Sequence, residues 1–270
     1  MNILISESLH GFLQKNLIDT ITFGSKMKHK NSSSSDNDFL HIIAEPYFFR
    51  NTCLFTGHQL QYKEYKNDVL IADHVYVTIR QFLHNIIHAE SGIPYEVLVH
   101  GQLKHTSLYW LEVFTDEFKN FQTARCFLGL AKRDLKDSTK IFRTDQKLSF
   151  KKLKFVVEGI QYVIDIISHY EVENEFKDVD YNGLLDKLKE DITYVDYRRI
   201  IDILSNIVEE YRKWMQYFLD FDKIPKNISK STFNVIGNYI NESPIIATKT
   251  IFDTTLNSLY YEAMVNNTFK

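Results

Sequence analysis

The sequence predicts an α+β protein, in which a small mixed sheet with flanking helices is followed by an all-helical C-terminal domain. Hydrophobic residues make up 44% of the 270 residues, enough for a sizeable packed core. Only 9 glycines and 4 prolines argue against a loop-rich all-β fold. Strand-like and helix-like periods alternate up to about residue 115, and helical periods follow. We therefore expect two domains, residues 1–115 and residues 116–270.

The first elements follow from the spacing of apolar residues. Residues 9–17 carry them at helical intervals, and Ser6 is placed to cap that helix. Residues 18–23 alternate with period two and stop at Gly24-Ser25, which predicts a short strand. The polar tract that follows includes four consecutive serines and has little to bury. We expect a loop there, before an apolar strand at 39–43.

Later elements divide into two groups. The β-branched and apolar run at 70–77 predicts a third strand. A helical stripe over 79–87 ends near Ser91-Gly92, and 95–99 is a further short strand candidate. Strand signals nearly vanish beyond residue 115, and long helical patterns cover 116–137, 149–170, 194–220 and 247–264.

Charge and cysteine content limit the function classes. A net charge of −3 gives no general reason to expect nucleic acid or an anionic membrane as a partner. Cys53 and Cys126 cannot form a disulfide framework, which suits a reducing compartment. No run approaches 18 apolar residues, so no membrane span is predicted, and the start lacks the basic region of a signal peptide. We expect a cytoplasmic protein from an AT-rich genome, viral genomes included.

One pattern combines residues suited to metal and phosphate chemistry. Phe23-Gly24-Ser25 closes a strand, and Asp36-Asn37-Asp38 opens the next after a ten-residue loop. Asp36 and Asp38 would point to one face, roughly 7 Å apart, where they repel each other unless a cation lies between them. Short oxygen ligands suit Mg²⁺, which takes one or two carboxylates plus substrate phosphates. Gly24 allows close backbone approach to a ligand, and Ser25 offers a hydroxyl and an N–H to phosphate oxygens.

A third carboxylate is needed to hold a catalytic metal. Asp73 is the first candidate, because a charge within an apolar strand is costly without a partner. Glu96, in the candidate strand 95–99, is the second. The alternative interpretation of Asp73 is a buried acid paired with an arginine such as Arg80.

This arrangement resembles the nucleotidyltransferase (DNA polymerase beta-like) superfamily. The pattern of that superfamily is a hydrophobic residue, Gly-Ser, a loop of similar length, Asp-x-Asp and a third acid on a later strand. More narrowly, the chain is similar to the predicted nucleotidyltransferase branch found in bacteria and phages, over roughly residues 8–165. The further matching segments are Asp73-His74-Val75-Tyr76 with Ile79-Arg80-Gln81-Phe82-Leu83, the turn and strand from Ser91 to Leu98, Phe127-Leu128-Gly129-Leu130-Ala131-Lys132, and Lys151 to Lys154.

The resemblance implies a nucleotidyltransferase-type sheet and transfer of a nucleotidyl group from a nucleoside triphosphate to an acceptor hydroxyl, with release of pyrophosphate. Asp36 and Asp38 would bind two Mg²⁺ or Mn²⁺ ions. Asp73 would complete the catalytic metal site and accept the proton of the attacking hydroxyl. The implied nucleotide contacts are Gly24, Ser25, Lys26 and Lys28, with Lys30 in the same loop.

Other classes of function stay open. A module of this fold can bind nucleotide or RNA without chemistry, and Asn37 between the aspartates favours that interpretation slightly. A protein-interaction effector would expose an aromatic patch on its helical half. For an enzyme, the acceptor is an RNA 3′ end, a small molecule or a protein side chain. The remaining basic positions are solvated or contact an anion, namely Lys151, Lys152 and Lys154 together with Arg125, Lys132 and Arg133.

Overall fold

The computed structural model describes residues 2–15, 17–27, 37–43, 59–171, 178–189 and 192–242. The chain divides into two compact units. The first consists of Met1–Thr115 and Ser229–Lys270, and the second of Asp116–Ile228. Within the described residues, none of the helices combines the length and the apolar character needed to cross a membrane.

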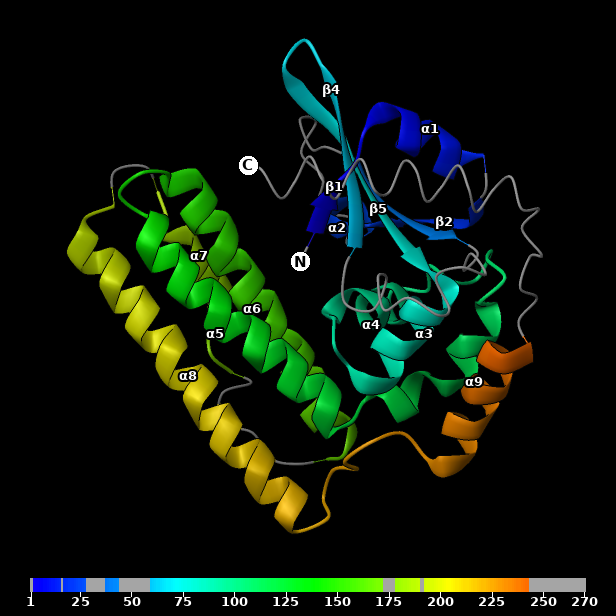
Figure 1. Ribbon diagram of the computed structural model, residues 1–270. Helices are drawn as coiled ribbons and strands as arrows, with labels where there is room; N and C mark the ends of the chain where they lie inside the picture. The colour runs from blue at the N-terminus through cyan, green and yellow to red at the C-terminus, as the bar shows by residue number, and fades with distance from the viewer. Residues whose placement is uncertain are drawn as a thin grey trace. The chain divides into compact units, whose positions relative to one another are not determined.

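A five-stranded mixed sheet forms the centre of the first unit (Figure 1), which confirms the predicted α+β class. Its strands are β1 (Asn2–Leu4), β2 (Leu17–Phe23), β3 (Asn37–Ile43), β4 (Gln59–Lys66) and β5 (Val69–Thr78). Their order across the sheet is β1-β4-β5-β3-β2. The central pair β3 and β5 runs parallel, whereas β2 with β3 and β4 with β5 run antiparallel.

The two faces of this sheet differ in chemistry because side chains alternate along each strand. One face carries Asp38 and Asp73 and then a buried apolar set, Leu40, Ile42, Val75 and Val77. The other face carries buried polar rings and meets α1 (Glu7–Gln14). Ser6 precedes this helix and caps it as predicted, because its hydroxyl accepts from the Leu9 N–H. Figure 1 shows α1 on one side of β2 and the helices α3 (Ile79–His88) and α4 (Gly92–Val99) on the other.

The prediction of a strand at 95–99 is wrong, because these residues belong to α4. A short apolar run has no period that separates strand from helix, so the flanking residues decide. The Ser91 hydroxyl caps the helix by accepting from the Ile93 N–H at 3.4 Å. Pro94 lies in the first turn, where its missing N–H has no intrahelical partner to lose.

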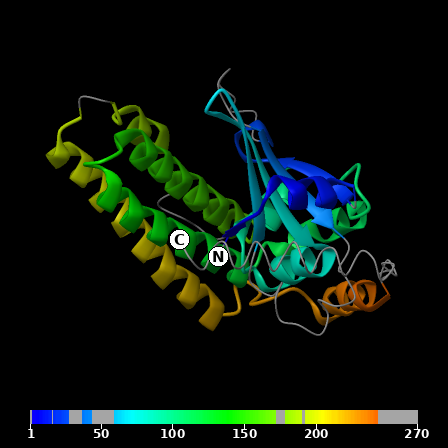
Figure 2. The same cartoon turned by 45° about the horizontal axis from the view of Figure 1, so that its top comes forward.

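Three long helices build the second unit. Here α5 (Phe121–Ile141) contacts both α6 (Gln146–His169) and α8 (Tyr194–Asp220), and the short α7 (Tyr181–Asp186) packs on α6. Figure 2 shows the three long helices from a second direction. Gly159 of α6 allows close packing on α5, because a Cβ there would lie 3.5 Å from the Phe127 carbonyl oxygen.

Two predicted helix ranges shift and one cannot be compared. The helix expected at 116–137 begins instead at Phe121, after the 3₁₀ helix η2 (Tyr109–Phe118) and an Asn120 cap. The helix expected at 149–170 begins at Gln146, and the one at 194–220 has the predicted bounds. The range 247–264 lies outside the described residues. The chain also forms α9 (Lys230–Glu242), which packs on α3 and belongs to the first unit.

Candidate functional site

Two carboxylates lie side by side at one end of the central strand pair. In the parallel register of β3 and β5, Asp38 is directly opposite Asp73. Neighbouring strands are roughly 4.8 Å apart, and in-register side chains point to the same face. Asp38 is in turn opposite Phe23, the last residue of β2. The strand order therefore brings together Gly24, Asp38 and Asp73, which are separated in the sequence.

Gly24 packs directly against the Asp38 carboxylate. Its φ angle is +70°, in the left-handed region that favours glycine. A Cβ atom at this position would lie 2.9 Å from Cγ of Asp38, which is closer than real Cβ contacts come. The backbone angle therefore favours glycine here, and a larger residue would displace the Asp38 carboxylate.

Gln61 holds the Asp73 carboxylate. Its Nε2 donates to both oxygens of Asp73, at 2.8 and 2.6 Å, from the neighbouring strand β4. Asp73 is half-buried, and these bonds satisfy part of its acceptor capacity. Gln61 was not among the residues that the sequence singled out, because nothing local to it indicates that β4 pairs with β5.

The other predicted site residues are placed as follows. Ser25 and Lys26 belong to the short helix α2 (Gly24–Met27) that continues directly from β2. Glu96, the second candidate for the third carboxylate, lies in α4 and not on a strand. Asp36, Lys28 and Lys30 lie outside the described residues. Among the residues that are described, no three His, Cys, Asp or Glu side chains are grouped as a set of metal ligands.

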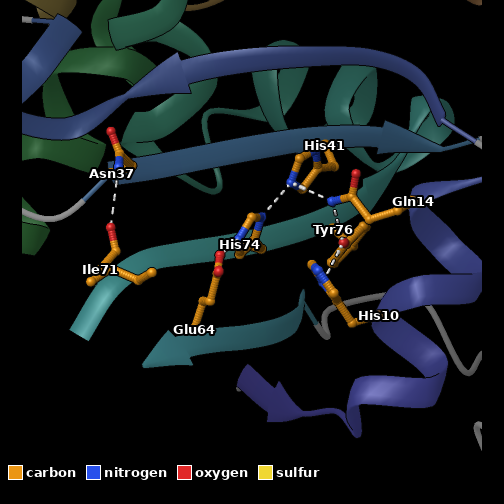
Figure 3. A network of polar contacts seen from close by, with 8 residues as sticks. All are labelled: His10, Gln14, Asn37, His41, Glu64, Ile71, His74 and Tyr76. Atoms are coloured by element: carbon orange, nitrogen blue, oxygen red, sulfur yellow. Dashed lines mark hydrogen bonds and ion pairs between the residues drawn. The ribbon is translucent and has the colours of Figure 1, made fainter. Parts of the chain in front are cut away.

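A network of polar side chains lies on the opposite face of the same strands (Figure 3). His41 Nε2 of β3 and His74 Nδ1 of β5 are 2.8 Å apart. Gln14 of α1 donates from Nε2 to the Tyr76 hydroxyl at 2.8 Å and lies 3.1 Å from His41 Nε2. The Tyr76 hydroxyl also contacts His10 Nδ1 at 2.8 Å. The network therefore joins α1 to the two central strands.

The network is uncharged at its centre at neutral pH. Burial, reinforced by the imidazoles of His74 and His10, lowers the pKa of His41 to about 3. Burial also raises the pKa of the Tyr76 hydroxyl. The hydrogen bond between His41 and His74 ties β3 to β5 in the register that places Asp38 opposite Asp73. The network thus has a structural role for the candidate site. The available sequence signal was the presence of two histidines within apolar strands.

At the start of β3, next to Asp38, Asn37 adds a further hydrogen bond between β3 and β5. Its side-chain Nδ2 donates to the Ile71 carbonyl oxygen at 3.2 Å, as Figure 3 shows. The residue between the two aspartates of the motif therefore bonds to the neighbouring strand β5.

No protein-family model matches the chain, and no curated protein matches its sequence. Among solved structures, the chain is similar to a nucleotidyltransferase-like protein from Exiguobacterium sibiricum 255-15. The TM-score is 0.29 and the identity 10%, and the match covers 77% of this chain and 72% of that chain. The strand register and the contact between Gly24 and Asp38, rather than this overlap, support the functional proposal that follows.

Proposed function

We propose that this protein is a divalent-cation-dependent nucleotidyltransferase, which moves a nucleotidyl group from a nucleoside triphosphate to an acceptor hydroxyl. The observation behind the proposal is the in-register pair Asp38 and Asp73, with the backbone of Gly24 packed against the first carboxylate. A paired carboxylate site beside a glycine turn suits a metal-bound triphosphate, because both the metal and the phosphates need close, oxygen-rich approach.

The chemistry of the two side chains fits Mg²⁺ or Mn²⁺. Carboxylates on adjacent strands repel each other. On β4, the Gln61 amide donates to Asp73 and Lys63 lies opposite Asp73 in the register, so part of its charge is compensated. Hard cations with oxygen ligands relieve this repulsion and leave coordination positions for phosphate oxygens. Asp36, two residues before Asp38 in the sequence, would supply a further carboxylate.

The residues of the chain would then have separate roles. Asp36, Asp38 and Asp73 would hold the cations, and Ser25 and Lys26 would contact the triphosphate beside Gly24. Asp73 would also accept the proton of the acceptor hydroxyl. The hydroxyl oxygen would then bond to the α-phosphorus, the bond from that phosphorus to the oxygen bridging to the β-phosphorus would break, and pyrophosphate would leave. A bound divalent cation would act as a Lewis acid and neutralise phosphate charge.

Calorimetric titration with the four ribonucleoside triphosphates, in Mg²⁺ and in EDTA, tests the binding part of the proposal. We expect Mg²⁺-dependent binding that falls by about tenfold or more in Asp38→Asn, since that change removes one charged ligand. Asp68→Asn is the matched control. Asp68 is exposed in the β4–β5 turn at a φ of 62°, a conformation that asparagine adopts readily. The Asp68→Asn variant should therefore bind triphosphate as the wild type does.

Pyrophosphate release in the presence of RNA 3′ ends, small hydroxyl compounds or protein acceptors tests the chemistry. We expect at least one acceptor to support release, and Asp38→Asn to lower its rate by roughly 100-fold or more. Mg²⁺-dependent binding without release for any acceptor would favour a non-catalytic nucleotide-binding module. Absence of Mg²⁺-dependent binding would contradict both functions.

A further inference from the structure

A basic groove lies in the helical unit, between α5 and α8. Its volume is about 750 Å³, within the range of small-molecule sites. The groove lining combines five cationic side chains with a single acidic one, namely Arg125, Lys132, Arg212, Lys213, Lys226 and Glu209. All of them belong to the second unit, whereas Asp38 and Asp73 belong to the first.

At one end of the groove, one ion pair links the two helices and two further pairs lie within α8, including Lys213 with Glu210. Lys132 Nζ of α5 lies 2.6 Å from Oε1 of Glu209 on α8. Arg212, one turn further along α8, lies 3.1 Å from Oε2 of the same carboxylate. Glu209 therefore orients two cations from different helices, while its single negative charge balances only one of them.

The opposite end of the groove carries cations without a counter-charge. Backbone bonds from Phe121 N to Pro225 O and from Gln122 N to Lys226 O bring Lys226 to the first turn of α5. Arg125 lies one turn further along the same helix. Both side chains are exposed, and within the part of the chain that the structure describes neither makes an ion pair. This end is therefore suited to an anion supplied from outside.

Gly129 keeps the middle of the groove open. It lies four residues after Arg125 and three before Lys132, so the three share one face of α5. Glycine weakens a helix relative to alanine. At Gly159 close helix packing explains the glycine, but a Cβ at Gly129 would meet no atom within 4 Å. Gly129 therefore leaves this part of the groove wall without a side chain.

We propose that this groove binds a small ligand with several phosphate groups. Guanidinium and ammonium groups donate charge-assisted hydrogen bonds to phosphate oxygens, and they lie along the groove at both ends. The groove is short, because it lies between the Lys132–Glu209 pair and the contacts of residues 225–226 with α5. The net charge of −3 gives no general attraction for a long polyanion. A short polyphosphate therefore suits the groove better than a long nucleic acid. The site does not depend on the proposed transferase function.

Titration of the full chain with sodium tripolyphosphate in EDTA tests the proposal, because EDTA removes any divalent cation from the sheet carboxylates. We expect the double variant Arg125→Gln/Lys226→Gln to bind at least about tenfold more weakly, since two charged donors are lost. Gly129→Gln should also lose binding, because its side chain would fill the groove, while helical circular dichroism stays unchanged.

The control double variant is Lys136→Gln/Lys154→Gln, which removes two exposed cations of α5 and α6 that lie outside the groove and have no ion pair among the described residues. Its affinity should equal that of the wild type, and so should that of Asp38→Asn. Equal losses in the control and groove variants would overturn the proposal. Binding of a single-stranded oligonucleotide without binding of tripolyphosphate would overturn it as well.

Discussion

Gly24 lies where an added Cβ atom would meet the Asp38 carboxylate of the candidate site. Gly24→Ala places a Cβ against the Asp38 carboxylate and puts alanine at a φ of +70°. We expect a loss of about 1–2 kcal/mol in the free energy of unfolding from the left-handed backbone alone, measured by urea titration. The displaced carboxylate should also abolish Mg²⁺-dependent triphosphate binding.

Gly11→Ala is the control for this substitution. Gly11 lies within α1, and a Cβ there would have no atom within 4 Å. Alanine should stabilise that helix by about 0.5–1 kcal/mol and leave triphosphate binding intact. A Gly24→Ala variant with wild-type stability and binding would show that Asp38 is not held by this contact.

His41 makes the stability of the first unit depend on acid. Its pKa is near 6.5 in the unfolded chain and about 3 in the folded one, so between these values the unfolded state binds more protons. Stability should therefore be complete above pH 6.5 and fall as the pH drops toward 3. We expect a loss of up to about 2 kcal/mol at pH 5 relative to pH 7.

Urea midpoints at pH 7 and pH 5 measure this effect, and His41→Gln, which cannot take up the proton, should show a smaller difference between them. His10 contributes in the same direction, because burial lowers its pKa too. Equal pH differences in the wild type and in His41→Gln would show that this imidazole is not buried in neutral form.

Individual site residues differed in how far the sequence could identify them. Asp38 was singled out by the spacing of the Gly-Ser and Asp-x-Asp motifs, and Asp73 because a charge in an apolar strand is costly without a partner; the structure places the two opposite each other. The side chain that holds Asp73 could not be predicted, because the role of Gln61 depends on the pairing of β4 with β5. Likewise, the contact between His41 and His74 depends on the register of two strands more than 30 residues apart.

At the scale of elements, α9 is the one whose role in the structure is least evident from its sequence. Its Ile236 is fully buried, whereas the adjacent Val235 is 46% exposed. Ile236→Ala should cost about 2–5 kcal/mol of unfolding free energy in the first unit, because the surrounding core collapses only in part. Val235→Ala should change it by less than about 0.5 kcal/mol, and thermal unfolding compares the two. Similar effects of both would mean that α9 is not docked through Ile236.

Elements with a strong period were predicted well, and those with mixed or short patterns were not. The long α8 has the expected bounds because its apolar residues repeat over many turns. In contrast, β4 alternates apolar residues with Gln, Lys and Glu, and its far end is exposed, so it has little apolar pattern to detect. For α4, an apolar run without a period was assigned to a strand, although its cap determined a helix.

At the scale of the whole molecule, the change near residue 115 from a mixed to a helical pattern could be read from the periodicity of the sequence. The return of the chain to the first unit after residue 228 could not be read from it. Residues 230–242 have a helical pattern like that of the preceding helices. Only packing distinguishes a helix that completes the sheet unit from one that extends the bundle. The segment 116–228 is therefore an insertion within the first unit, connected to it at both ends.

This connectivity sets an order of assembly during synthesis. The ribosome releases the last residue of the helical bundle before the first residue of α9, so the bundle is complete in sequence while the sheet unit still lacks one of its helices. Domains commonly mature from the N-terminus onward. Here the earlier-starting unit finishes last, and its surface on α3 stays uncovered until more than a hundred further residues have been added.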